Sequence, residues 1–416
     1  MASIAIRRED KHEWERRVPL SPRGVASLLE QGIDVTVQPS SIRAFGDDAY
    51  RAAGAQIQED VAAADVLFAV KEVPLDLLRK DGAYVFFSHT IKGQEHNLPL
   101  LRKLMDLGCT LIDYERIVDE RGRRLVFFGR HAGLAGMVDT LSVLGKRMTA
   151  LGKVSAFSEL GLAHEYDGLD DVKAAVTRIG DELDEPLVVG FAGYGNVSQG
   201  AQTIFDLLPH EEIEPDELGG EHSGLVKVVF KECHLVERKE GAFELQEYYD
   251  HPDRYRSIFN RHLPHLSLLV NAIYWTEDYP RLVTKAQLRE LFAGGEPKLR
   301  VIGDISCDID GSIECTVKAT TPGVPAYVYD PSRDAVRDGF EGDGVAMMTT
   351  DCLPCELPVA SSEAFTDALA PFVAEMARAR FDGAFAAAGL PDPIRKATIL
   401  WRGEFTPDFA YMKAFL

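Results

Sequence analysis

Two ionisable residues follow two neighbouring apolar runs within the first hundred residues. Lys71 comes directly after the run 66–70, and His89 comes two residues after the run 83–87. Short uncharged runs of this kind are typical of buried parallel strands, and functional groups in open parallel sheets gather at the carboxyl ends of strands. Lys71 and His89 are therefore candidates for an acid/base pair near neutral pH. The alternative is a surface lysine and a hydrogen-bonded core histidine.

A second pattern lies in the middle of the chain. The apolar run 187–191 leads into two glycines spaced by one residue, and a helical pattern begins near Gln199. A strand, a glycine turn and a helix favour a dinucleotide site, because the turn lets a pyrophosphate approach the backbone N–H groups of the helix. Ser198 holds the place of the usual third glycine, and Gly200 lies two residues on. An ordinary tight turn is the alternative. The candidate cofactor-binding residues are Gly193, Tyr194, Gly195, Asn196 and Val197.

The elements around these motifs predict an α/β protein. In the first 130 residues we expect a helix opened by Ser21 as N-cap and Pro22. We also expect helices at 47–53 and 97–107, and strands at 3–6, 34–38, 66–70, 84–87 and 110–113. Long helices are expected at 129–151 and 165–183. Beyond them we expect strands at 187–191, 225–230, 266–274 and 299–305, a polar insertion at 210–224 and a helix at 251–263.

The C-terminal part predicts a discontinuous first domain. A helix from Ser361 to about residue 388 has no sheet of its own, so we expect it to return to the first domain. The predicted fold is two Rossmann-like domains with parallel sheets around a central cleft. The expected bounds are 1–130 plus 345–416 for the substrate and catalytic domain, and 131–344 for the dinucleotide-binding domain.

Composition narrows the class of protein. The chain has 416 residues, 46% of them hydrophobic, and a formal net charge of −21, which argues against a nucleic-acid partner. No run is long enough to span a membrane, and no signal peptide opens the chain, so we expect a cytoplasmic protein with reduced thiols. Cys352 and Cys355 have CxxC spacing, but neither a zinc site nor a redox site is expected there. We expect no metal.

Several motifs together resemble the lysine–2-oxoglutarate reductase family over nearly the whole chain. They are Ile6-Arg-Arg-Glu-Asp-Lys11, Trp14-Glu-Arg-Arg17, Pro19-Leu-Ser-Pro22, Phe86-Phe-Ser-His-Thr-Ile-Lys92, Leu111-Ile-Asp-Tyr-Glu115, Gly193-Tyr-Gly-Asn-Val-Ser198, His251-Pro-Asp-Arg-Tyr255, Ile302-Gly-Asp-Ile-Ser-Cys-Asp308 and Gly311-Ser-Ile-Glu314. The wider group also contains saccharopine dehydrogenases, alanine dehydrogenase and a transhydrogenase subunit.

The resemblance implies an activity. It is the NADPH-dependent condensation of L-lysine with 2-oxoglutarate to saccharopine, with NADH as the alternative cofactor. In animals and plants this domain is usually fused to a saccharopine dehydrogenase domain. This chain ends where that domain would begin, so it looks like a free-standing reductase whose pathway partner would be a separate saccharopine dehydrogenase.

The resemblance also implies site residues. Lys71 and His89 match the acid/base pair, and Arg17 matches an arginine that holds a substrate carboxylate, although the neighbouring Arg16 is an alternative. Lys92 is a weaker candidate for a substrate acid group. Glu72 and Glu115 match acids that tune the charge of the pair, and Asp308 matches an aspartate near the nicotinamide.

Two other functions compete with this one. The chain could be a related NAD(P)-dependent dehydrogenase, either alanine-dehydrogenase-like or an NAD-linked lysine-forming saccharopine dehydrogenase. It could also be a non-catalytic nucleotide-binding protein. The combined presence of Lys71, His89, Arg17 and the glycine turn argues against the last. The His251–Tyr255 insertion separates the reductases from the alanine enzymes.

Overall fold

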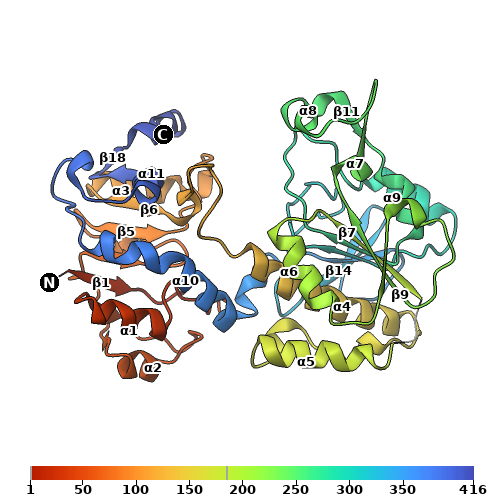
Figure 1. Ribbon diagram of the computed structural model, residues 1–416, viewed down its shortest axis with the longest axis horizontal. Coiled ribbons are helices and arrows are strands. Elements are labelled where there is room, and N and C mark those ends of the chain that lie inside the picture. Colours follow the sequence, from red (N-terminus) through yellow and green to blue (C-terminus); the bar gives the residue numbers. More distant parts are fainter. Residues whose placement is uncertain (1, 184–185) are drawn as a thin grey trace. The chain divides into compact units, whose positions relative to one another are not determined.

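The computed structural model describes residues 2–183 and 186–416, so the expected end of the second long helix near residue 184 lies partly outside the described residues. The chain forms two compact units (Figure 1). The first combines the residues up to Phe128 with Pro358–Leu416, and the second is the continuous segment Gly129–Leu357. The first unit is therefore discontinuous in sequence. No helix among the described residues has the length and apolarity to cross a bilayer.

The first unit is built on an eight-stranded sheet with the order β18-β17-β6-β5-β4-β1-β2-β3. The strands from β3 to β6 run parallel, and only the β17 and β18 edge is antiparallel. The strands are β1 (Ser3–Ile6), β2 (Asp34–Val37), β3 (Gln56–Ile57), β4 (Val66–Phe68), β5 (Ala83–Phe86), β6 (Thr110–Asp113), β17 (Thr398–Trp401) and β18 (Glu404–Phe405). The helices are α1 (Pro22–Glu30), α2 (Asp47–Ala52), α3 (Leu98–Asp106), α10 (Pro358–Ala377) and α11 (Asp392–Ala397). The strand order reverses between β1 and β4, the point where ligands bind in such folds.

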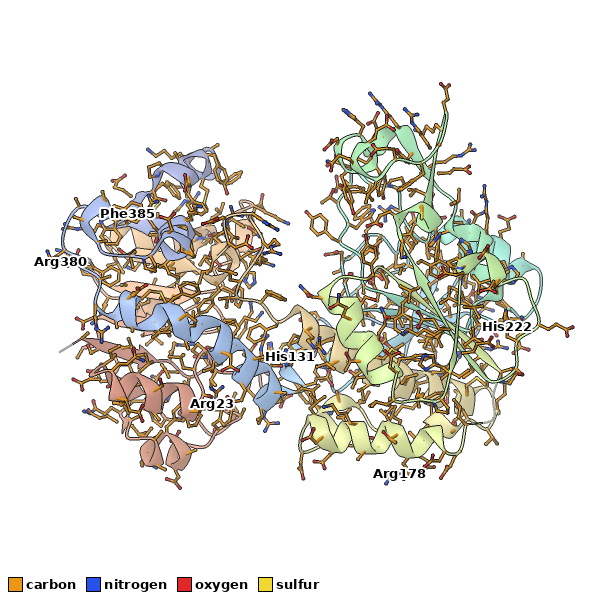
Figure 2. All side chains as sticks on the ribbon, viewed as in Figure 1. Arg23, His131, Arg178, His222, Arg380 and Phe385 are labelled. Atoms are coloured by element: carbon orange, nitrogen blue, oxygen red, sulfur yellow. A yellow bond between two sulfur atoms is a disulfide. The ribbon has the colours of Figure 1, made fainter. Side chains whose placement is uncertain are left out.

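The C-terminal segment completes this unit. Helix α10 lies beside α1, and Arg23, labelled in Figure 2, pairs with Glu363 at 2.7 Å. Ser21 is the N-cap residue of α1 as predicted, but its side chain makes no capping bond, and its backbone N–H donates to Thr366 Oγ1 at 2.8 Å. The expected return of the tail to the first domain is confirmed. The segment also contains a strand that was not predicted, because residues 398–401 form an apolar edge strand, β17, that pairs with β6.

The second unit is also built on a mostly parallel sheet, with a different order of its edge strands. Its eight-stranded sheet has the order β15-β14-β16-β13-β12-β7-β9-β8, and the order reverses between β7 and β12. The strands are β7 (Leu187–Ala192), β8 (Glu211–Ile213), β9 (Leu225–Phe230), β12 (Leu268–Asn271), β13 (Val301–Asp304), β14 (Ala326–Asp330), β15 (Ala335–Asp338) and β16 (Val345–Met348), with a separate hairpin of β10 (Val236–Arg238) and β11 (Tyr255–Ser257). The helices are α4 (Gly129–Ala150), α5 (Leu169–Gly180), α6 (Asn196–Phe205), α7 (Glu232–Leu235), α8 (Leu245–Asp250) and α9 (Lys285–Ala293).

Five expectations about the two units need correction. The polar insertion 210–224 contains the edge strand β8, whose Glu211 and Glu212 hide it from a search for apolar runs. The segment 251–263 is not a helix, because Pro252 opens only a short 3₁₀ turn before β11. Helix α6 begins at Asn196 rather than near residue 199, and α10 ends at Ala377 rather than 388. Residues 345–348 pair with β13, so the second unit extends to Leu357 rather than to 344.

The cysteines also differ from expectation. Cys352 and Cys355 form a disulfide, because a 3₁₀ turn over residues 353–355 brings their Cα atoms to 5.5 Å. The expectation of reduced thiols is therefore wrong for this pair. The other cysteines in the described part of the chain are free.

Two glycines allow helices α4 and α6 to cross closely. A Cβ on Gly133 would lie 1.9 Å from the carbonyl oxygen of Val197, and a Cβ on Gly200 would lie 2.1 Å from that of Arg130. Gly200, the displaced third glycine, thus serves close helix packing, which is the role that glycine has in the nucleotide-binding turn. The crossing holds the start of α6 against the long helix α4.

We expect Gly200→Ala to lower the free energy of unfolding by about 1–3 kcal/mol, because the added methyl meets backbone that cannot move aside cheaply. Denaturant unfolding of the whole chain measures the loss. Gly219→Ala is the matched control, since its Cβ would meet nothing within 4 Å, and it should stay within about 0.5 kcal/mol of the parent chain. Equal stability of the two variants would contradict close packing at this crossing.

Candidate functional site

The carboxyl end of β4 is fixed by a buried carboxylate. Glu9, in the loop after β1, accepts the backbone N–H of Val70 at 2.6 Å and that of Lys71 at 3.1 Å. Burial, followed by the nearby charge of Glu15, raises the pKa of Glu9 to about 7. Because β1 and β4 flank the reversal of strand order, this contact fixes Lys71 at the place where parallel sheets carry their functional groups.

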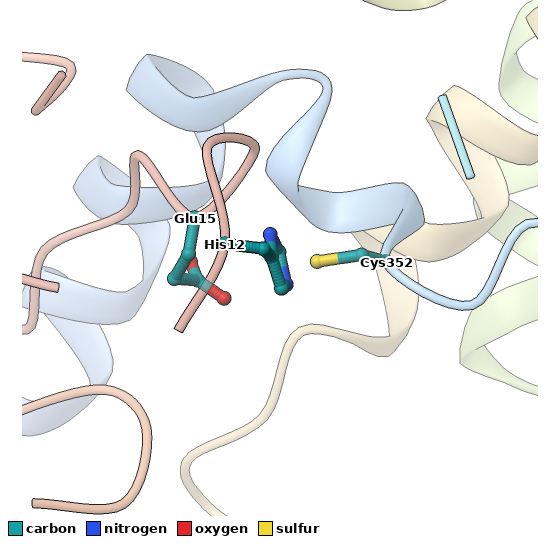
Figure 3. A group of neighbouring side chains, drawn as sticks. All are labelled: His12, Glu15 and Cys352. Carbon is teal, nitrogen blue, oxygen red and sulfur yellow. The ribbon is translucent and has the colours of Figure 1, made fainter. Parts of the chain in front are cut away.

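A second buried carboxylate holds Arg17. Glu15 accepts two hydrogen bonds from the guanidinium, Nε at 2.7 Å and Nη2 at 2.6 Å, and the guanidinium lies 4.2 Å from the ring centre of Phe128. Figure 3 shows Glu15 beside His12 on the loop after β1. Of the two arginines considered, Arg17 is buried in this cluster, whereas Arg16 is exposed and donates to the carbonyl of Ile42. The two arginines thus differ in burial and in partner, and which of them holds a substrate carboxylate stays a prediction.

The surroundings of Lys71 favour its neutral form. Burial is the largest cause that lowers the pKa of Lys71, and the positive charges of Arg17 and Lys11 lower it further. The carboxylates of Glu15 and Glu72 oppose this shift but do not cancel it. A lowered pKa increases the neutral fraction of a lysine, and it is the neutral amine that accepts a proton in general-base lysines.

His89 is oriented by Glu72, the residue that follows Lys71. Its Nδ1 lies 2.6 Å from Glu72 Oε1, and Lys11 Nζ lies 2.9 Å from Oε2. Burial would raise the pKa of Glu72, but the bonds from His89 and Lys11 outweigh it and hold the pKa well below the usual range. The carboxylate is thus ionised and accepts from Nδ1–H, which leaves Nε2 as the nitrogen that can accept a proton in the neutral ring.

The turn before His89 is held by hydrogen bonds. Ser88 donates its backbone N–H at 3.1 Å and its hydroxyl at 2.5 Å to the buried Asp113, and Asn97 donates to the carbonyl of His89 at 3.3 Å. His89 has a positive φ of 48°, which is uncommon for a residue with a side chain. These contacts support that backbone conformation.

Two other predicted residues have no hydrogen bond or ion pair with Lys71 or His89 among the described residues. Glu115 pairs with Arg124 at 2.7 Å, and its backbone N–H donates to Asp113 at 2.8 Å. Lys92 is exposed in a turn. Sequence reasoning missed Glu9 and Glu15. Both stand in the charged stretch that opens the resemblance, but single acids among basic residues carry no spacing signal.

A cavity of about 350 Å³ lies beside this cluster in the first unit. Its lining comes from the loops that follow β1 and β2, and it includes Glu9, the residue that fixes Lys71. The full lining is Arg8, Glu9, Asp10, His12, Glu13, Pro39, Ser40, Ser41 and Ile42. The cavity therefore lies next to Glu9, which holds the backbone of the candidate base Lys71.

In the second unit the glycine turn fits a pyrophosphate. Gly193 has a φ of +94° and donates its N–H to the carbonyl of Phe230 at 3.0 Å, and Gly195 is the N-cap of α6. A Cβ on Gly195 would meet nothing within 4 Å, so the space in front of the first free N–H groups of α6 is open. Asn196 and Val197 begin the helix. This open space, backbone donors and the helix dipole suit a phosphate group.

The predicted aspartate near the nicotinamide lies in the loop after β13. Asp308 is exposed there, and its carbonyl accepts the N–H of Gly311 at 2.9 Å. A buried neighbour that sequence reasoning did not select is Asp304, which accepts from Asn271 at 2.7 Å and Thr316 at 2.5 Å. Burial raises the pKa of Asp304 to about 6 despite these bonds.

Comparison with known proteins identifies the family. The profile described as "Alanine dehydrogenase/PNT, N-terminal domain" matches residues 5–135, and "Alanine dehydrogenase/PNT, C-terminal domain" matches residues 238–408. A solved L-alanine dehydrogenase covers 99% of each chain with a TM-score of 0.62 at 20% identity. A transhydrogenase from Sinorhizobium meliloti covers 97% of this chain and 98% of its own with a TM-score of 0.54 at 15% identity. At these identities the structures show the fold alone, which confirms the predicted α/β fold with two Rossmann-like domains.

Sequence relatives are more similar. Alpha-aminoadipic semialdehyde synthase of Bos taurus is 38% identical over 99% of this chain and 48% of its own length. The protein of that name from Arabidopsis thaliana is 37% identical over 98% of this chain and 41% of its own length. Saccharopine dehydrogenase [NAD(+), L-lysine-forming] of Neurospora crassa is 27% identical over 88% of this chain and 89% of its own length. The chain spans about half the length of the synthases.

These matches place the molecule in a class of pyridine-nucleotide-dependent dehydrogenases with two α/β domains. The chain belongs to the alanine dehydrogenase/PNT family. The cofactor class is accordingly NAD(P)H, and the predicted resemblance to this wider group is confirmed.

We expect Gly195→Leu to abolish binding of NAD(P)H, because the side chain would enter the open space that a phosphate needs. Titration of cofactor fluorescence measures the dissociation constant. Gly219→Leu, with equally open surroundings in the same unit, should bind as the parent chain does. Unchanged affinity in Gly195→Leu would remove this turn as the phosphate site.

We expect Glu72→Gln to lower the free energy of unfolding by about 1–3 kcal/mol at about pH 5, where the carboxylate is ionised in both states. The native pKa of Glu72 lies below its unfolded value, so its stabilising contribution is present above the unfolded pKa and is lost as the pH falls. The difference from the parent should therefore narrow at about pH 3. Denaturant unfolding at both pH values measures it, with the exposed Glu120→Gln as control. A difference independent of pH would contradict the ion pair.

Proposed function

We propose that the chain is an NADPH-dependent reductase that condenses L-lysine with 2-oxoglutarate to form saccharopine. The observation that carries the proposal is the Lys71–Glu72–His89 arrangement at the strand ends of the first unit. The reductive chemistry needs a base and an acid near neutral pH, and these two side chains provide them. The similarity to the synthases and to the lysine-forming saccharopine dehydrogenase supports the choice of substrates.

The chemistry follows from the side chains. Lys71, whose pKa is lowered, takes a proton from the ε-ammonium of the substrate, so that the neutral amine can attack the ketone carbon. His89 donates a proton to the oxygen that leaves as water when the carbinolamine becomes an imine. NADPH, when bound, supplies the hydride that reduces the imine carbon. Lysine, 2-oxoglutarate, NADPH and a proton thus give saccharopine, NADP⁺ and water.

The carboxylates of 2-oxoglutarate need a cation in a strongly acidic protein. Arg17 is our candidate, because Glu15 takes Nε and Nη2 and Nη1 lies outside that pair. Lys92 and Glu115 remain weaker candidates for substrate contact, and Asp308 for the cofactor site. The synthases, which this chain matches over about half of their length, are the relatives that suggest these substrates.

A second candidate is a deaminating dehydrogenase of the alanine type, which the family assignment favours. Oxidation of NADPH and NADH with 2-oxoglutarate and a panel of amino acids separates the two. We expect turnover with lysine and saccharopine as the product by mass spectrometry. Turnover only with ammonia and a 2-keto acid would favour the alanine type, and no turnover with any pair would favour a non-catalytic nucleotide-binding protein.

We expect Lys71→Met and His89→Gln each to lower turnover by about 10²–10⁴-fold, the usual range for positioned acid/base groups. Cofactor affinity should be nearly kept, since both residues belong to the first unit and the glycine turn to the second. Stopped-flow turnover and cofactor titration measure the two effects. Lys80→Met and His96→Gln, both exposed, are the matched controls.

The pH–rate profile gives an independent measurement on the same variants. The parent profile should be bell-shaped, with two apparent pKa values that belong to the pair. Each substitution should flatten one limb. Full turnover with both limbs kept in Lys71→Met would leave Lys71 a surface lysine without a catalytic role.

A further inference from the structure

Four of the charged residues that follow β9 are candidates for distinguishing NADPH from NADH, and their contacts differ. They are Lys231, Glu232, Arg238 and Lys239. The end of β9 adjoins the glycine turn, because the N–H of Gly193 donates to the carbonyl of Phe230 at 3.0 Å. In such folds this strand end faces the adenosine ribose, where an acid favours NAD and a base favours NADP. The sequence alone leaves four candidates of mixed charge.

The carboxylate of Glu232 already has two hydroxyl donors. Tyr249 of α8 donates to Oε1 at 2.7 Å, and Tyr194 of the glycine turn donates to Oε2 at 3.2 Å. For each tyrosine, burial and then Glu232 raise the pKa of the hydroxyl, so both are protonated donors at neutral pH. Glu232 therefore links the glycine turn to α8 through two tyrosine hydroxyls.

Two of the three cations also have partners. Arg238 pairs with Glu247 at 2.7 Å, and Glu247 holds Arg254 at the same distance. The ammonium of Lys239 donates to the carbonyl of Asp253 at 2.7 Å. These contacts direct both side chains to the segment 247–254 rather than to the glycine turn.

Lys231 differs from both. Its side chain is exposed, and within residues 2–183 and 186–416 no carboxylate forms an ion pair with its ammonium. Its backbone is fixed from both sides, since its N–H donates to His234 Nδ1 at 3.1 Å and its carbonyl accepts the N–H of His234 at 2.8 Å. A fixed backbone with an unpaired ammonium is suited to a phosphate, which a lysine binds as a point charge.

We propose that Lys231 binds the 2′-phosphate of NADPH, and that Glu232 is a positioning residue for Tyr194 rather than a ribose-binding acid. The inference rests on the proposed function only in its use of the glycine turn as the cofactor site. In this proposal Lys231 is the one of the four side chains that selects NADPH over NADH.

The test is cofactor binding, independent of any amino-acid substrate. Fluorescence titration gives the affinities for NADPH and NADH, and calorimetry gives those for adenosine 2′,5′-bisphosphate and 5′-AMP. We expect Lys231→Gln to lower the affinity for NADPH and for the bisphosphate by about 10–100-fold, as for loss of a charge-assisted contact. The affinities for NADH and 5′-AMP should stay within about twofold of those of the parent chain. Lys239→Gln removes the same charge nearby and should change neither preference.

Glu232→Gln tests the second part of the proposal, the role of Glu232 as a positioning residue. Because Glu232 does not bind the ribose in this proposal, NADH affinity should stay within about threefold, whereas loss of a ribose-binding acid would cost about 10-fold or more. The proposal is overturned if Lys231→Gln weakens both cofactors equally, if it weakens neither, or if the parent chain prefers NADH. If the parent chain binds NADPH more tightly than NADH and Lys231→Gln removes this preference, but no saccharopine is formed from lysine and 2-oxoglutarate, the proposed substrates are overturned and the role of Lys231 is kept.

Discussion

Two buried carboxylates in the loop after β1 hold the charged end of the first sheet together. Glu9 binds the backbone at Val70 and Lys71, and Glu15 binds the guanidinium of Arg17. A buried cation without a partner is costly, so the loop has to fold onto the sheet before Lys71 and Arg17 can be buried together. The lowered pKa of Lys71 then results from a balance in which burial and the cations outweigh two acids. The acid/base chemistry therefore depends on residues that need not touch a substrate.

The two units use similar, mostly parallel sheets for different electrostatic purposes. The strand order reverses between β1 and β4 in the first sheet and between β7 and β12 in the second, and the functional loops follow β4 and β7. In the first unit that loop brings side-chain charges, with Glu72 between Lys11 and His89. In the second it brings backbone N–H groups and open space at Gly195. Side-chain charges suit proton transfer and carboxylate binding, whereas uncharged backbone donors suit a phosphate. One fold thus provides both kinds of binding.

The sequence predicted the parts that depend on local patterns. Apolar runs located β1, β4, β6, β7 and β9, and strand ends placed Lys71, His89 and the glycine turn correctly. It missed what depends on distant pairing, since β8 and β17 become strands only because a neighbouring strand pairs with them. Glu9 and Glu15 were missed because burial by the fold, not spacing, gives them their roles. The ion pair of Glu115 with Arg124 also depends on the fold, and no spacing pattern predicted it.

The edge position of β17 has a consequence for the order of synthesis. Residues 398–401 are synthesised only after the whole of Gly129–Leu357. All residues of the second unit are therefore present while β6 is paired with β5 alone and still lacks β17 on its other edge. Until then the nascent first unit exposes the unpaired edge of an apolar strand, and helix α10 is missing from its place beside α1. Pairing of β17 with β6 is a contact between distant parts of the chain, and such contacts form slowly. The edge of β6 is therefore open to pairing with other chains until residues 398–401 have been synthesised and have folded back.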